Sequence, residues 1–80
     1  MQGKYIIFER DGLEYPVLIP FNKASHNQVL VYRDGVEDKA VSAGLFSEYD
    51  GVVSVADSSI TLNFFPRKED ANIIQRAFEA

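Results

Sequence analysis

The stretch KAVSAGLFSEYDG, residues 39–51, has the length and composition of a long β-strand that ends in a tight turn. Its centre holds Ser42, Ala43 and Gly44, three small residues where larger side chains would stabilise a strand better. The Asp50-Gly51 pair that follows is a strong signal for a two-residue hairpin turn. The stretch therefore predicts a strand that needs space around its centre and turns directly into a hairpin.

Two explanations of the small residues follow from the alternation of side chains along a strand. Val41, Ala43 and Leu45 share one face, and Ser42, Gly44 and Phe46 share the other. If a helix crosses the sheet, Ala43 allows a close approach on the covered face and Gly44 permits a bulge or a sharp bend. Alternatively, Ser42 and Gly44 form a shallow floor for a ligand or a partner's side chain. We favour the packing explanation.

Further strand patterns lie on both sides of this stretch. An Asp11-Gly12 pair between two apolar runs predicts a first hairpin. Pro16 cannot donate a ladder hydrogen bond, which places its strand at an edge or a bulge. The polar segment 21–28 is read as a loop or a single helical turn begun at Ser25, and Asp34-Gly35 as another turn. The predicted strands are 4–9, 14–20, 29–33, 39–49, 52–56 and 59–65, which form an antiparallel meander.

The last 15 residues, PRKEDANIIQRAFEA (66–80), change from a strand pattern to a helical one. Ile73, Ile74, Ala77 and Phe78 form an apolar stripe at helical spacing, so we predict a helix from about Lys68 to Phe78. No Ser, Thr or Asn caps its start, and it must be stabilised by packing its stripe onto the sheet. The predicted fold is α+β: a single domain, 1–80, in which a twisted antiparallel β-meander of five to six strands carries one C-terminal α-helix on one face.

Composition limits the kind of partner. The 80 residues include 12 acidic and 8 basic side chains, for a net charge of −4, and the basic ones are scattered. Direct nucleic-acid binding needs a concentrated basic face, so we do not expect it. No apolar run approaches the roughly 18 residues that cross a bilayer, and we expect no membrane association. The absence of cysteine favours the cytoplasm.

The sequence predicts no catalytic, cofactor or metal site. His26 is the single histidine, and without cysteine a zinc site would need carboxylates as its remaining ligands. Ser25 is its neighbour in sequence, but no nucleophile elbow is present. The five glycines are spread along the chain and form no phosphate-binding loop. We therefore read His26 as a loop or capping residue.

Aromatic residues suggest a binding surface instead. Because one helix cannot cover both faces of such a sheet, we expect Phe46 and Phe65 to form an exposed apolar patch on the uncovered face. Glu48, Asp50 and Asp57 would lie at its edge. The alternatives are a sheet that curls until both faces are buried, and an acidic rim that serves only solubility.

Several short motifs resemble those of small single-domain proteins of tailed bacteriophages and prophages. The first strand KYIIF is similar, as are His26 to Val29, SAGLF at 42–46 and Ser59 to Leu62. The helix start is similar too, with Arg67, Glu69, Asp70 and Ala71, although Lys68 stands where a proline is expected. The resemblance implies phage origin and an accessory role without enzymatic activity.

Taken together, these features predict a non-enzymatic phage or prophage accessory protein. We expect it to bind a host bacterial or phage protein in the bacterial cytoplasm, either alone or as a homodimer. One alternative is an anti-defence inhibitor, similar to an anti-CRISPR, that uses its acidic surface. Another is a minor structural protein of the virion.

Overall fold

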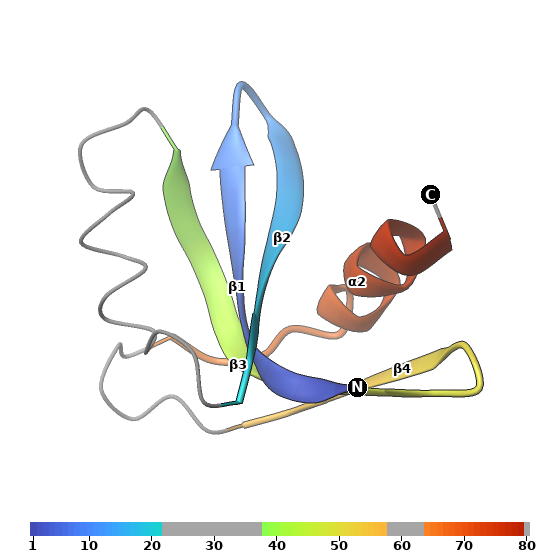
Figure 1. The fold of residues 1–80 in the computed structure, drawn as a ribbon. Coiled ribbons are helices and arrows are strands. Elements are labelled where there is room, and N and C mark those ends of the chain that lie inside the picture. Colours follow the sequence, from blue (N-terminus) through green and yellow to red (C-terminus); the bar gives the residue numbers. More distant parts are fainter. Residues whose placement is uncertain (22–37, 58–63, 80) are drawn as a thin grey trace.

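The computed structural model describes residues 1–21, 38–57 and 64–79. In these residues β1 (Gln2–Arg10), β2 (Leu13–Pro20), β3 (Lys39–Tyr49) and β4 (Val52–Ala56) form one antiparallel sheet. The helix α2 (Asp70–Glu79) packs on one side of it (Figure 1). The predicted α+β class and the terminal helix are confirmed.

The order of the strands differs from the predicted meander. The sheet order is β2-β1-β3-β4, so β3 lies between β1 and β4, whereas the meander predicted 29–33 as the neighbour of 39–49. A prediction of five to six strands is not confirmed. The segments predicted as a loop at 21–28 and a strand at 29–33 with the Asp34-Gly35 turn lie outside the described residues, except for Phe21. So does most of the strand predicted at 59–65, whose described residues Phe64 and Phe65 belong to no strand.

Two of the three predicted Asp-Gly turns, Asp11-Gly12 and Asp50-Gly51, are confirmed as hairpins. Asp11 and Gly12 join β1 to β2 with φ angles of 53° and 81°, and Asp50 and Gly51 join β3 to β4 with 51° and 80°. Two consecutive left-handed residues form the turn whose twist matches that of the flanking strands, and Asp and Gly tolerate this conformation. Pro16 lies in β2, which is an edge strand of the described sheet, as its missing N–H predicts.

The central strand β1 is buried on both faces. Tyr5 and Ile7 join a cluster under α2, whereas Ile6 and Phe8 point into a second cluster on the opposite face. Phe64 packs against this second cluster. A strand covered on both sides reads as a continuous apolar run rather than an alternating one, which explains the sequence YIIF.

Close packing explains the small residues of β3, but the covered face is not the one we predicted. Gly44 pairs with Tyr5, which lies under α2, so the helix covers the face of Ser42 and Gly44 rather than that of Ala43. A Cβ atom on Gly44 would lie 2.6 Å from the carbonyl oxygen of Ala56. The crowding at Gly44 therefore comes from Ala56, Pro66 and Tyr5 and not from the helix, whose close approach we had predicted. The bulge that we had placed at Gly44 lies earlier, where the β1–β3 register shifts between Ile7 and Phe8.

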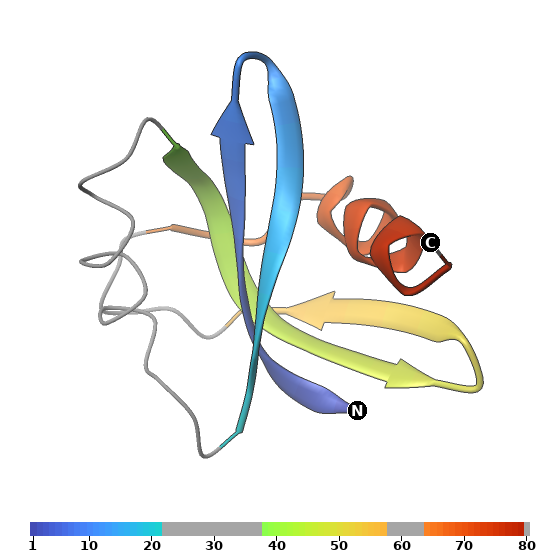
Figure 2. The ribbon, with the colours of Figure 1, turned by 45° about the horizontal axis from the view of Figure 1, so that its top comes forward.

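The helix lies in the angle between β2 and the β3–β4 hairpin, and the two views agree on this position (Figures 1 and 2). Ile73 and Ile74 are its buried apolar residues. Gln75 binds the edge of β4: its Oε1 accepts a hydrogen bond from the Val53 N–H at 2.9 Å, and its Nε2 donates one to the Gly51 carbonyl. The Gln75 amide thus occupies edge groups with which another strand would pair.

Candidate functional site

The β3–β4 hairpin has one face turned away from the helix. Cross-strand pairing places Tyr49 opposite Val52 and Ser47 opposite Ser54, and side chains two positions apart on a strand share a face. We call these four side chains the outer face. Val53, on the other side of the same hairpin, packs under α2. The hairpin therefore contributes to the core with one face and leaves the outer face for other contacts.

The outer face combines exposed apolar groups with hydroxyls. Tyr49 is 60% exposed and Val52 is 68% exposed. The Oγ atoms of Ser47 and Ser54 are 2.8 Å apart and share a hydrogen bond. Gln2, on the neighbouring strand β1, donates a hydrogen bond from Nε2 to the Tyr49 hydroxyl and so fixes the position of that ring. The arrangement is a rigid strand surface with an apolar end and a polar middle.

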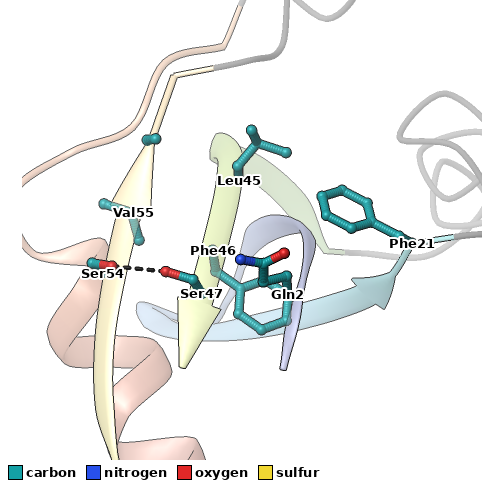
Figure 3. A pocket seen from close by; sticks show the side chains of 8 residues that line it. Gln2, Phe21, Leu45, Phe46, Ser47, Ser54 and Val55 are labelled. Carbon is teal, nitrogen blue, oxygen red and sulfur yellow. Dashed lines mark hydrogen bonds between the residues drawn. The ribbon is translucent and has the colours of Figure 1, made fainter. Parts of the chain in front are cut away.

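A pocket of about 260 Å³ adjoins this surface (Figure 3). The ring of Phe21, at the end of β2, points toward Leu45 of β3 across the hollow. Apolar and polar groups both contribute to its walls. The lining residues are Gln2, Phe21, Leu45, Phe46, Ser47, Ser54, Val55 and Ala56.

Negative charge surrounds the hairpin. Residues 40–57 contain Glu48, Asp50 and Asp57 and no lysine or arginine. Asp50 and Asp57 are exposed. The charge of Glu48 is partly compensated, because one of its carboxylate oxygens accepts the Gly51 N–H at 3.0 Å and the other lies 3.5 Å from the amino group of Met1. The two aspartates therefore carry most of the uncompensated charge of the hairpin.

The predicted aromatic patch is wrong for one of its two members. Phe46 is 2% exposed and packs under the helix, with its ring centroid 6.3 Å from that of Phe78. It is buried because α2 covers the face of β3 that we expected to be open. Phe65 is exposed, at 64%, as predicted, and lies in the segment before α2. The role of Phe65, Glu48, Asp50 and Asp57 in binding stays a prediction.

A buried polar cluster, which the sequence did not predict, joins the start of α2 to the sheet. The Asp70 carboxylate is fully buried and accepts hydrogen bonds from the Tyr5 hydroxyl at 2.8 Å and the Ser42 hydroxyl at 2.9 Å. It also accepts the backbone N–H and the Nε–H of Arg67, both at 3.0 Å. Arg67 in turn donates to both carboxylate oxygens of Glu14 on β2. We call these five residues the Asp70 cluster.

The cluster changes the acidity of its members. Burial, followed by the hydrogen bond to Asp70, raises the pKa of Tyr5 well above its usual value. The hydrogen bond to Glu14 is the main reason that the pKa of Arg67 is raised. The same bond lowers the pKa of Glu14. Tyr5 therefore stays a neutral donor and Arg67 a cation, the states in which they donate hydrogen bonds to Asp70 and Glu14.

The position of Asp70 also explains how the uncapped helix begins. Its carboxylate accepts the backbone N–H of Arg67, three residues earlier, and its own N–H donates to the Arg67 carbonyl at 3.1 Å. This is one half of a capping box, in which an acidic side chain in the first turn reaches back to the residue that precedes the helix. The Arg-x-x-Asp spacing before an apolar stripe was the sequence signal for it.

A second buried carboxylate belongs to Asp38, just before β3. The Arg10 Nε–H and the Tyr15 hydroxyl both donate to it, so it connects to the first hairpin. Within 1–21, 38–57 and 64–79, no group of three or more His, Asp or Glu side chains is arranged to hold a metal ion. His26 lies outside the described residues. No helix in the described part of the chain is long and apolar enough to cross a membrane.

Comparison with known proteins gives no family for this chain. A scan against protein-family models, a search of curated proteins and a search of solved structures found no match.

Proposed function

We propose that this protein acts without catalysis, by binding another protein through the outer face of the β3–β4 hairpin. The observation that carries the proposal is the exposure of Tyr49 and Val52 side by side on a strand surface bordered by Asp50. Interfaces gain affinity mainly from desolvated aromatic and aliphatic groups, whereas charges at the rim steer and select the partner. The proposed partner is a basic protein of the bacterial host or of a phage, encountered in the cytoplasm.

The buried polar groups support binding rather than chemistry. The hydroxyls of Tyr5 and Ser42 are the most buried side-chain donors near the helix, and both are used by Asp70. Their hydrogen bonds hold secondary-structure elements together. An accessory role for a phage or prophage, as the sequence resemblance implies, fits a protein of this kind.

The test compares two exposed apolar residues at different hairpins. Val52→Lys places a charge at the apolar end of the outer face, and Leu13→Lys is the matched control, because Leu13 is 75% exposed at the other hairpin. Each variant is used to capture proteins from a bacterial host lysate, with quantification by mass spectrometry, and the captured partner is then purified for titration. We expect Val52→Lys to weaken binding at least tenfold and Leu13→Lys to leave it unchanged. Equal binding by both variants, or equal loss, contradicts the proposal.

A separate measurement distinguishes binding to a partner from self-association. Sedimentation of the wild-type protein and of Val52→Lys reports whether the outer face forms a homodimer. Asp50→Lys is expected chiefly to slow association with a basic partner, with a larger effect at low salt, because exposed charges are screened at high ionic strength. An association rate that does not depend on salt would mean that Asp50 has no steering role.

A second candidate is an anti-defence inhibitor that occupies a nucleic-acid channel of its target. The absence of lysine and arginine from residues 40–57, beside three acidic side chains, favours it. Such an inhibitor competes with nucleic acid for the partner. Excess single- or double-stranded DNA or RNA should then displace the protein from the captured partner. Undiminished binding in the presence of nucleic acid would eliminate this candidate and leave the general binding role.

A further inference from the structure

The pocket beside the outer face has the size of a single side chain. Its volume of about 260 Å³ lies below the range of roughly 300–1,000 Å³ that is usual for small-molecule and cofactor sites. A partner that covers the outer face would place residues directly over the opening, because Ser47 and Ser54 belong to both. The size therefore favours an anchoring side chain of a protein partner.

The walls of the pocket combine an apolar body with polar groups. Phe21 and Leu45 supply apolar surface. Gln2 uses its Nε2 to hold Tyr49, and its Oε1 accepts no hydrogen bond from a described residue. A side chain with an apolar ring and a donor at its tip matches this combination, which is the property that enriches tyrosine and tryptophan at interfaces.

We propose that the pocket receives a tyrosine or tryptophan side chain of the protein partner, with lysine or arginine beside it in the partner's sequence. The basic neighbours are argued from charge complementarity, because Asp50 and Asp57 lie at the two ends of β4 and are both exposed. The inference rests on the proposed function and adds the chemistry of the contact. The ring supplies the desolvated anchor, and the cations contact the acidic rim.

The pocket can be tested without the partner by using small probes. Tyramine carries a phenol and an ammonium group, tyrosol carries the same phenol without the charge, and phenethylamine carries the charge without the hydroxyl. Each is titrated into the full chain, with backbone amide chemical shifts as the readout. We expect tyramine to shift the amides of Leu45, Ser54 and Val55 with a dissociation constant of about 1–10 mM, as is usual for so small a ligand. Tyrosol and phenethylamine should bind several-fold more weakly.

A pair of variants provides the control. Ser54→Phe fills the pocket, whereas Leu13→Phe places the same ring at the other hairpin, outside the pocket lining. Amide spectra that match the wild type away from the substitution show that each variant is folded. Tyramine binding should be lost in Ser54→Phe and kept in Leu13→Phe. Binding that survives in Ser54→Phe, or is lost equally in both, places the probe elsewhere and overturns the inference.

The two proposals fail in different ways. If tyramine produces no shifts at these amides, the pocket is not an aromatic site. The outer face is then still tested independently, by the affinity of Val52→Lys for the captured partner. If tyramine binds as expected but Val52→Lys binds the partner normally, the outer face is wrong and the inference built on it falls with it. Equal affinities for tyramine and tyrosol would refute the expected basic neighbours.

Discussion

Removing the carboxylate of Asp70 should destabilise the protein more than any single change on its surface. Asp70 is fully buried and accepts two hydroxyl donors from the sheet, one from Tyr5 and one from Ser42. It also forms an ion pair with Arg67, with the Nη2 atom 2.9 Å from Oδ1. Asp70→Ala removes the acceptor and leaves the two hydroxyls without a partner.

The size of the stability loss follows from the buried groups that lose Asp70 as their partner. A buried polar group without a partner costs about 1–3 kcal/mol, and Tyr5 and Ser42 are both fully buried. Breaking a buried ion pair by removing one partner costs about 3–5 kcal/mol. Arg67 keeps Glu14 and part of its exposure to water, which reduces its share. We therefore expect a loss of about 3–5 kcal/mol, a large part of the roughly 4–12 kcal/mol that holds a domain of this size together.

Urea unfolding measures this loss, and milder variants keep it measurable. Asp70→Asn retains one acceptor oxygen and should lose less than Asp70→Ala. Ser42→Ala and Tyr5→Phe each remove one donor without leaving a buried donor unpaired, so each should cost about 1–2 kcal/mol. In a double-mutant cycle, Tyr5→Phe should cost less in the Asp70→Ala background than in the wild type.

A loss below about 1 kcal/mol for Asp70→Ala, with an unchanged denaturant slope, would show that the Asp70 carboxylate does not stabilise the fold as described. An equal cost of Tyr5→Phe in both backgrounds would also contradict the prediction, because additive costs mean that the two groups do not interact.

Gly44→Val should strongly destabilise or unfold the chain, although valine is the better strand residue, because a Cβ would lie 2.6 Å from a backbone carbonyl oxygen; a thermal melt at or above the wild-type midpoint would contradict this. Phe78→Ala should cost about 2–3 kcal/mol in a urea melt, less than for a fully buried ring, because Phe78 is only partly buried against Phe46; a loss below about 1 kcal/mol would mean that this ring adds little to helix packing. Glu14 has a lowered pKa in the folded state, so the stability that it contributes is present above its unfolded pKa of about 4.3 and is lost as the pH falls through the folded value. Glu14→Gln should therefore be less stable than the wild type at pH 7, by no more than about 1 kcal/mol, because the Glu14–Arg67 pair is partly exposed. The difference in stability should disappear in acid. A difference that does not depend on pH would exclude the ionised carboxylate of Glu14 as its cause.

The acidic residue at the start of the helix shows how far a local pattern reaches. The sequence alone places Asp70 in the first turn, where negative charge favours the helix dipole. Its burial against Tyr5 and Ser42 depends on residues 65 and 28 positions away in the chain. No local pattern indicates which first-turn carboxylate faces the core, because this depends on the surface of the sheet against which the helix packs.

The sequence alone determined the features that arise from neighbouring residues. The Asp11-Gly12 and Asp50-Gly51 turns could be predicted because both residue types tolerate the left-handed conformation that a two-residue hairpin needs. The terminal helix could be predicted from its apolar stripe. The edge position of β2 could be predicted from the missing N–H of Pro16.

Tertiary structure alone decided the order of the strands and the face that the helix covers. Both depend on contacts between distant segments: β1 lies beside β3, and α2 packs over Ser42, Gly44 and Phe46. The alternating pattern of β3 offered two faces and did not say which one the helix would cover. The helix covers the face of Ser42 and Gly44, where the Ser42 hydroxyl donates to the Asp70 carboxylate and a Cβ atom on Gly44 would lie 2.6 Å from the Ala56 carbonyl oxygen. That choice buries Phe46 and leaves Tyr49 and Val52 as the exposed apolar surface of the hairpin.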